Sequence, residues 1–204
     1  MKLIKPFYQI EHCPDNLNAI MEAGATCYKS EPKDVNKFVG MLIRKGHLSV
    51  LEHEYIRVRF IVDRGVGYEL IRHRLCSFSQ ESTRYCNYKD GVTFIIPPWF
   101  DTKELEDNDD GQFHNTDIWL NHMLNCEKAY LALLAQGETP QQARSVLPNS
   151  LKTEIVVTAN LREWMHIFKL RCSKMSHPQM RQVMIPLRDE LNKKLPVIFE
   201  TNTL

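Results

Sequence analysis

Apolar residues along the chain follow two different periods, which together predict a mixed fold. Between positions 55 and 62, apolar and polar residues alternate, so that Ile56, Val58, Phe60 and Val62 share one face. This pattern predicts a half-buried strand of the kind found in antiparallel sheets. Shorter strands are predicted from β-branched and apolar runs at residues 2–10, 92–96 and 153–159.

Helical spacing, with apolar residues three and four positions apart, recurs in six other stretches. In the stretch 114–136, the apolar face is so wide that we expect it to pack against both the core and a partner subunit. Pro32 suits the first turn of the second helix, and Gly46 suits its C-terminal cap. Asn160 is expected to cap the fifth helix, with Glu163 as its partner in the first turn. The six predicted helices cover residues 15–25, 32–45, 114–136, 140–147, 161–168 and 178–195.

The stretch 72–85 (RHRLCSFSQESTRY) combines arginine, histidine and hydroxyl side chains in one short segment. Apolar residues upstream repeat at helical spacing, so we expect Arg72–Arg74 to end a helix, where the macrodipole favours cations. Beyond Leu75 the stretch has no aliphatic residue and many donors, which is typical of a ligand-binding loop. Arginine forks and hydroxyls suit an anionic, planar, oxygen-rich ligand such as a nucleotide. An exposed basic turn is the alternative interpretation.

Two further segments are distinctive in composition. Residues 46–54 (GHLSVLEHE) hold two histidines, a serine and two carboxylates. Such residues can bind a metal, but their spacing matches no zinc motif, so we expect no metal and keep a histidine-rich connection as the alternative. Residues 101–112 (DTKELEDNDDGQ) are acidic and polar, and we interpret them as a solvated loop without a function.

Composition and charge narrow the class of protein. The 204 residues are 43% hydrophobic and 25% charged, as in a soluble protein of one large domain or two small ones. A net charge of +1 argues against a general nucleic-acid-binding protein and indicates a focused anion site. The six cysteines form no CxxC pair, which argues against a zinc ribbon. Without a signal peptide or an apolar run near the roughly 20 residues of a membrane helix, a cytoplasmic protein with reduced thiols is expected.

The stretch 72–85 is similar to the signature of flavin-dependent thymidylate synthases. That signature is Arg-His-Arg, seven residues and then serine, which corresponds here to residues 72–74 and Ser82. The Arg-Tyr pair that follows in the family is present as Arg84 and Tyr85. The match in composition, spacing and order makes this the most specific motif of the chain.

Three supporting segments resemble the same family and occur in the expected order. They are the Gly-His segment at 46–53, the Ala-Arg-x-x-Leu-Pro segment around Arg144, and the Asn-x-Arg pattern within 160–171. The alternative interpretation is that Arg144 is a surface cation that binds no ligand. Because the resemblance covers nearly the whole chain, we expect a single domain over 1–204, with an α/β (α+β) fold in which helices pack around a central antiparallel sheet.

The resemblance also implies an activity, namely the reductive methylation of dUMP to dTMP. Methylenetetrahydrofolate would supply the carbon, NADPH the electrons, and FAD would carry the hydride. The family assembles as a homotetramer with shared active sites, so an oligomer is expected, without nucleic-acid or membrane partners. Two alternatives remain, a basic-loop nucleic-acid-binding module and a flavin-binding homologue without activity.

Individual roles follow from the resemblance residue by residue. It implies that Arg162 and Arg171 are catalytic and that His47 and His53 lie in the folate region. For Ser82 we favour ligand binding over nucleophilic attack, because no Ser-His-Asp arrangement is legible. The residues expected to bind dUMP are Glu69, Arg72, Gln80, Ser82, Arg84, Arg144 and Arg171. Those expected to bind FAD are Ser49, Glu52, Arg72, His73, Arg74, Leu75, Ser79, Gln80, Asn160, Arg162, His166 and Leu170.

Overall fold

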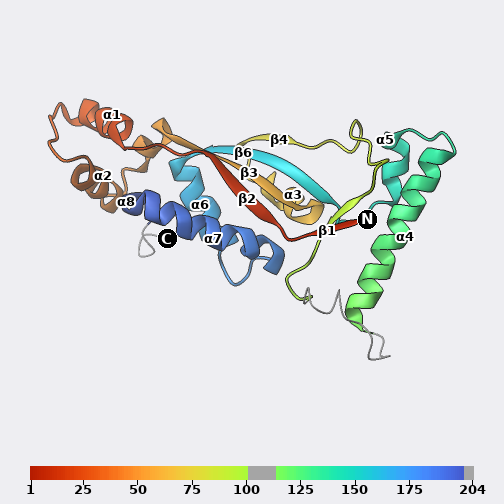
Figure 1. Ribbon diagram of the computed structural model, residues 1–204. Coiled ribbons are helices and arrows are strands. Elements are labelled where there is room, and N and C mark those ends of the chain that lie inside the picture. Colours follow the sequence, from red (N-terminus) through yellow and green to blue (C-terminus); the bar gives the residue numbers. More distant parts are fainter. Residues whose placement is uncertain (101–113, 200–204) are drawn as a thin grey trace. The chain divides into compact units, whose positions relative to one another are not determined.

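The computed structural model describes residues 1–100 and 114–199 and confirms the mixed fold, in which helices pack against an antiparallel sheet (Figure 1). The acidic stretch 101–112 lies outside the described residues. The chain divides into two compact units, so the expectation of one domain over 1–204 stays a prediction. The first unit consists of Met1–Phe7, Ile61–Glu69 and Gln80–Ile155, and the second unit of Tyr8–Phe60, Leu70–Ser79 and Val156–Leu204.

The main sheet has four strands in the order β2–β3–β6–β4. Strand β3 (Tyr55–Asp63) confirms the predicted alternation, because all four of its expected inward positions are fully buried. Strand β6 (Lys152–Asn160) likewise matches the strand predicted at 153–159. Both strands contribute residues to each unit, so the chain passes through them from one unit to the other.

The stretch predicted as one strand at 2–10 forms two strands instead, β1 (Lys2–Ile4) and β2 (Phe7–His12). Pro6 stands between them, and a proline has no backbone N–H with which to continue a ladder. Strand β1 pairs in parallel with β5 (Thr93–Ile95) in a separate two-stranded sheet.

The first half of the stretch 72–85 differs from the prediction in two places. Helix α3 (Arg64–Leu70) ends earlier than predicted, so Arg72–Arg74 lie in the following turn and not in the helix. The backbone N–H of His73 closes that turn on the carbonyl of Leu70 at 3.1 Å. The expected loop contains strand β4 (Ser77–Gln80), which sequence periodicity missed because its half-buried positions include a glutamine.

In the second unit, helices pack around α6 (Leu161–Arg171), whose predicted apolar face is buried. Asn160 caps this helix as expected, and its Oδ1 accepts the N–H of Glu163 at 2.8 Å. The indole of Trp164 donates to the carbonyl of Ile56 at 3.1 Å, which ties α6 to β3. The other helices of this unit are α1 (Asn18–Tyr28), α2 (Val35–Arg44), the 3₁₀ helix η1 (Leu48–His53), α7 (Pro178–Lys194) and α8 (Pro196–Phe199) (Figure 1).

Two of these helices begin later than predicted. Helix α1 begins at Asn18, three residues after the expected start. The cap of α2 is Asp34, whose carboxylate accepts the N–H of Lys37 at 3.0 Å, so Pro32 lies before the helix. Asp34 satisfies an orphan N–H of the first turn, which proline cannot do. Gly46 follows the end of α2 with a positive φ of 76°, one residue beyond the C-cap.

In the first unit, α4 (Asn115–Ala135) packs beside α5 (Pro140–Ala143) and the 3₁₀ helix η2 (Arg144–Val146) (Figure 1). The helix predicted at 140–147 is therefore one short α-helical turn followed by a 3₁₀ turn. Met123 and Tyr130 of α4 are buried against apolar residues of the β5 region. Within residues 1–100 and 114–199, none of the helices combines the length and apolar character that a membrane span requires.

Candidate functional sites

In the second unit, the turn that follows α3 buries His73 and exposes its neighbours. Only 6% of His73 is accessible, whereas Arg72, Arg74 and Leu75 are exposed. The backbone N–H of Cys76 donates to the carbonyl of His73 at 3.1 Å, which continues the turn. The exposed arginines are therefore available to a ligand, while the imidazole is buried in the protein interior.

His73 is joined to α6 by side-chain contacts. The Nε of Arg171 donates to its Nε2 at 2.9 Å, and a carboxylate oxygen of Glu163 lies 3.5 Å from its Nδ1. The His166 ring approaches edge-on, with 6.1 Å between ring centroids. Of the residues predicted for the site, His73, His166 and Arg171 are thus brought together, and Glu163 joins them. We call these four residues the His73 cluster.

Burial shifts the pKa values of His73 and Glu163, the two buried members of this cluster. It lowers the pKa of His73 to about 4, with help from the charges of Arg171 and His166. Burial also raises the pKa of Glu163, an effect that His166 opposes. The pKa of the Cys76 thiol rises to about 12, because of burial and then the Glu163 charge, so Cys76 remains a thiol at neutral pH. A protonated, partly buried thiol suits packing and not nucleophilic attack.

The His73 cluster also has some geometric features of a metal site. Ligand atoms of His73, Glu163 and His166 all lie within 4.8 Å of one another. However, the Arg171 guanidinium occupies the Nε2 side of His73, and its positive charge opposes a divalent cation there. The sequence-based expectation of no metal stays a prediction.

A second group of predicted residues surrounds a cavity of about 450 Å³ in the second unit. His47, Ser49 and Arg162 line this cavity. Arg162 also donates to the carboxylate of Glu52 at 2.6 Å, and both side chains are about half exposed. His53, which ends η1, is not among the lining residues. The cavity falls in the range of roughly 300–1,000 Å³ that small-molecule sites occupy.

The remaining flavin candidates of the second unit are placed more loosely. The Asn160 oxygen is engaged in capping α6, so a ligand would meet its NH₂ group. Leu75 and Leu170 are 77% and 48% exposed, so both side chains are accessible to a ligand. Ser79 is exposed on β4.

In the first unit, a smaller cavity of about 260 Å³ is lined by two arginines. Arg144 begins η2 and donates to the hydroxyl of Thr83 at 3.1 Å. Arg64 lies against Tyr68, with its guanidinium 5.5 Å from the ring centroid. Two cations and a hydroxyl in one cavity suit an anion, and we call this the arginine pocket.

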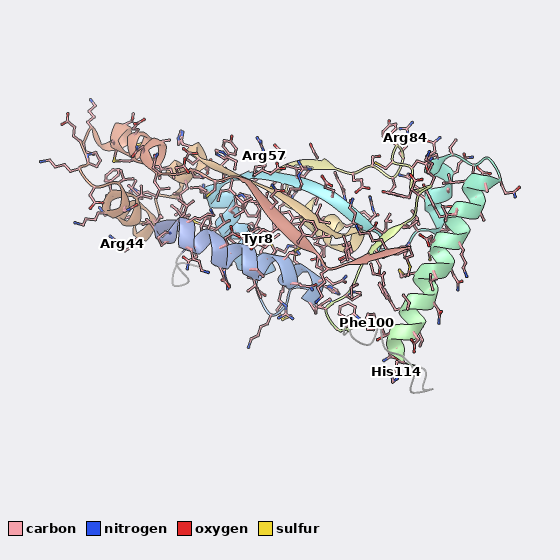
Figure 2. The ribbon with its side chains drawn as sticks, in the orientation of Figure 1. Tyr8, Arg44, Arg57, Arg84, Phe100 and His114 are labelled. Carbon is pink, nitrogen blue, oxygen red and sulfur yellow. The ribbon has the colours of Figure 1, made fainter. Side chains whose placement is uncertain are left out.

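Arg84, which is labelled in Figure 2, lies in the same unit as Ser82. The backbone N–H of Arg84 donates to the Ser82 hydroxyl at 3.3 Å. The Arg84 side chain donates to Gln141 at 3.2 Å and lies over the Tyr85 ring. Gln80, another predicted residue, donates to the Thr153 hydroxyl at 3.2 Å. Glu69 is half-buried on α3.

Glu81 anchors this loop, although sequence reasoning gave it no role. Its carboxylate accepts from the Tyr88 hydroxyl at 2.8 Å, from Lys152 Nζ at 2.7 Å and from the Glu154 N–H at 3.2 Å. Burial and the hydrogen bond to Glu81 raise the pKa of Tyr88, so its hydroxyl stays neutral and donates. The network fixes the start of the Ser82–Arg84 segment on β6.

Besides Glu81, four residues of these sites were not predicted from the sequence to belong to them. Two of them could have been found from the sequence, because Thr83 is a hydroxyl residue inside the motif and Arg64 belongs to the local cluster of arginines. Tyr68 carried no signal of its own. Glu163 was expected only as a helix-capping partner, but its side chain turns to the His73 cluster instead.

Comparison with known proteins gives consistent matches along the chain. A family model described as Thymidylate synthase complementing protein (Thy1) matches residues 9–197. The flavin-dependent thymidylate synthase of Geobacter sulfurreducens is 31% identical over 202 residues, with 93% of this chain and 83% of the relative covered. Those of Clostridium tetani and Mycobacterium avium are 30% and 32% identical, covering 94% and 87% of this chain and 84% and 76% of the relatives.

The neutral state of His73 leads to a prediction about acid stability. The unfolded chain binds a proton at His73 near its ordinary pKa of about 6.5, while the folded chain resists it until about pH 4. Because the folded pKa is lowered, stability is lost as pH falls from 6.5 to 4, by up to about 3 kcal/mol for this group at about 1.4 kcal/mol per pH unit. The variant His73→Gln, which takes up no proton, should lose correspondingly less.

Denaturant unfolding of both proteins at several pH values between 7.5 and 4 checks this expectation. His122→Gln is the matched control, because His122 is exposed on α4 and its loss should leave the wild-type slope unchanged. Equal slopes for wild type and His73→Gln would show that His73 titrates alike in the folded and unfolded chain.

Proposed function

Because the chain belongs to the Thymidylate synthase complementing protein (Thy1) family, we propose that it is a flavin-dependent thymidylate synthase. It converts dUMP to dTMP, with methylenetetrahydrofolate as carbon donor and NADPH as reductant. One observation supports this most directly: the two most specific stretches of the sequence, around His73 and around Arg171, meet through a 2.9 Å hydrogen bond. The fold thus brings a residue of each stretch into one cluster, in which His73 and Glu163 are buried.

FAD fits the donors and surfaces that the second unit offers. Ser49 and Arg162 line a cavity of suitable size, and Glu52 holds Arg162 in place. Arg72 and Arg74 extend from the turn at His73 and suit the anionic pyrophosphate. When bound, FAD supplies the hydride transfer, which no side chain can perform. The other residues assigned to FAD are Leu75, Ser79, Gln80, Asn160, His166 and Leu170. His73 keeps this assignment from the family resemblance alone, because it is buried.

The arginine pocket of the first unit suits the phosphate of dUMP. Arg144 presents its guanidinium there, and Ser82 and Arg84 flank Thr83, which lines the same pocket. A phosphate dianion needs such charge-assisted donors. The other residues assigned to dUMP are Glu69, Arg72, Gln80 and Arg171. We assign Ser82 to binding and not to attack, since its oxygen accepts the Arg84 N–H.

The proposed chemical role of the site is to stabilise negative charge. Arg162 and Arg171 are the catalytic residues of this proposal, because fixed cations near the pyrimidine favour the enolate-like charge that develops during reduction. His47 lines the same cavity as Arg162, which supports its assignment to the folate region; His53 keeps this assignment from the resemblance alone.

We further propose that the protein is a cytoplasmic homotetramer whose active sites are shared between subunits. All six cysteines are free, as a reducing compartment would keep them. On α4, Ile118 is 56% exposed and Trp119 is partly buried, which leaves apolar surface for a partner. Light scattering with FAD present should give four times the chain mass of 23.9 kDa. A monomeric mass would contradict shared sites.

The direct test of the activity is conversion of dUMP to dTMP by the purified protein. We expect dTMP to form when FAD, NADPH and methylenetetrahydrofolate are all present, and none to form when any one is omitted. If the protein binds FAD and dUMP but makes no dTMP under these conditions, it is a silent homologue and the proposal is wrong.

The arginine pocket predicts a phosphate-specific effect of Arg144. A hydrogen bond to a charged group contributes about 1.5–3 kcal/mol, so Arg144→Ala should weaken dUMP binding roughly 10- to 150-fold. Arg144→Lys should recover part of this, because an ammonium cannot reproduce the guanidinium fork. Titration of the flavin absorbance with dUMP gives these affinities.

Two controls make the Arg144 measurement specific. Deoxyuridine lacks the phosphate, so its binding should be weak and nearly equal in wild type and both variants. Arg44→Ala removes an exposed arginine on α2 and should leave dUMP binding unchanged (Figure 2). An equal loss for dUMP and deoxyuridine in Arg144→Ala would place Arg144 away from the phosphate.

A further inference from the structure

Glu163 is a buried carboxylate that none of the assigned roles explains. Its exposed fraction is 7%, and its backbone N–H, not its side chain, takes part in the cap of α6. Burying a carboxylate is costly unless it interacts favourably with a nearby group. Nδ1 of His73 lies 3.5 Å from its Oε1.

The hydrogen bond on the other side of His73 decides where the imidazole carries its proton. The Nε of Arg171 can only donate, so His73 Nε2 at 2.9 Å must be an unprotonated acceptor. A neutral imidazole then carries its one proton on Nδ1, the atom that faces Glu163. The heavy-atom positions alone therefore require one tautomer.

We propose that Glu163 is a positioning residue that acts through His73 on Arg171. Its carboxylate attracts the Nδ1 proton of His73, holds the imidazole in that tautomer, and so leaves Nε2 to accept the Arg171 bond. The inference rests on the proposed function in one respect, because Arg171 is assigned to dUMP. Glu163 itself need touch neither substrate nor flavin.

Electrostatics favours this tautomer of His73 over the other one, in which the proton is on Nε2. In the other tautomer, Nε2–H would oppose the Arg171 donor, and the Nδ1 lone pair would oppose the Glu163 carboxylate. Both contacts would become repulsive. At 3.5 Å the link to Glu163 is a charge–dipole contact and not a short hydrogen bond, so the charge of the carboxylate matters more than its exact orientation. His166 and Cys76 are the other titratable groups facing the cluster.

Substitutions at Glu163 separate charge from shape. Glu163→Gln keeps the shape but removes the charge, and its amide can turn to donate to Nδ1, which favours the tautomer that releases Arg171. Glu163→Asp keeps the charge and should restore most of the wild-type behaviour. Glu138→Gln, the same change at an exposed position, is the matched control.

The test uses the full-length, FAD-loaded protein with ¹⁵N-labelled histidine. Long-range ¹H–¹⁵N spectra report which ring nitrogen of each histidine is protonated, and His73→Gln identifies the resonances of His73. We expect protonated Nδ1 and bare Nε2 in wild type, Glu163→Asp and Glu138→Gln, and a mixture or reversal in Glu163→Gln. In parallel, Glu163→Gln should bind dUMP about 2- to 10-fold more weakly, because Arg171 is still present but loses the bond that positions it.

The two readouts fail in different ways. An unchanged tautomer in Glu163→Gln overturns the inference. A changed tautomer with unchanged dUMP affinity also overturns it, because Glu163 would then set the tautomer without positioning Arg171. If wild type binds no dUMP, the proposed function fails, while the tautomer spectra still decide whether Glu163 controls His73. Should Glu163→Gln not fold, an Nε2–H tautomer in Glu163→Asp would count against the inference, and an Nδ1–H tautomer would support it.

Discussion

The hydrogen bond between Arg171 and His73 is the constraint on which the candidate flavin site depends. It joins a tight turn after α3 to the last turn of α6, two segments about 100 residues apart in sequence. A buried polar group left without a partner costs about 1–3 kcal/mol, so the imidazole, the guanidinium and the Glu163 carboxylate must be placed together. Burying His73 also turns its neighbours Arg72 and Arg74 outward, where they can meet an anionic ligand.

Local patterns predicted much of the fold. The alternation in β3, the cap of α6 at Asn160 and the apolar face of α6 were all confirmed, because each depends on residues within one element. Predictions failed where tertiary contacts override local preference. Strand β4 looked like a loop because its serines and glutamine gain strand structure only by pairing in the sheet.

Residues of the candidate site could be predicted where they belong to a sequence motif. They could not be predicted where their partners depend on three-dimensional packing. The His73, His166 and Arg171 group came from two motif segments, and the fold brings it together. Glu81 and Glu163 gave no comparable signal, since their partners are set by three-dimensional packing: Lys152 lies 71 positions from Glu81. The sequence thus indicates which motif residues lie together better than it indicates which groups hold them in place.

The central claim is that the surfaces around the His73 turn and Arg162 form a flavin site. Titration of the flavin-free protein with FAD, followed by the change in flavin fluorescence, tests this claim most directly. The account predicts saturable binding that ends at one FAD per chain. Absence of saturable FAD binding, in protein shown to be folded by circular dichroism, would contradict it.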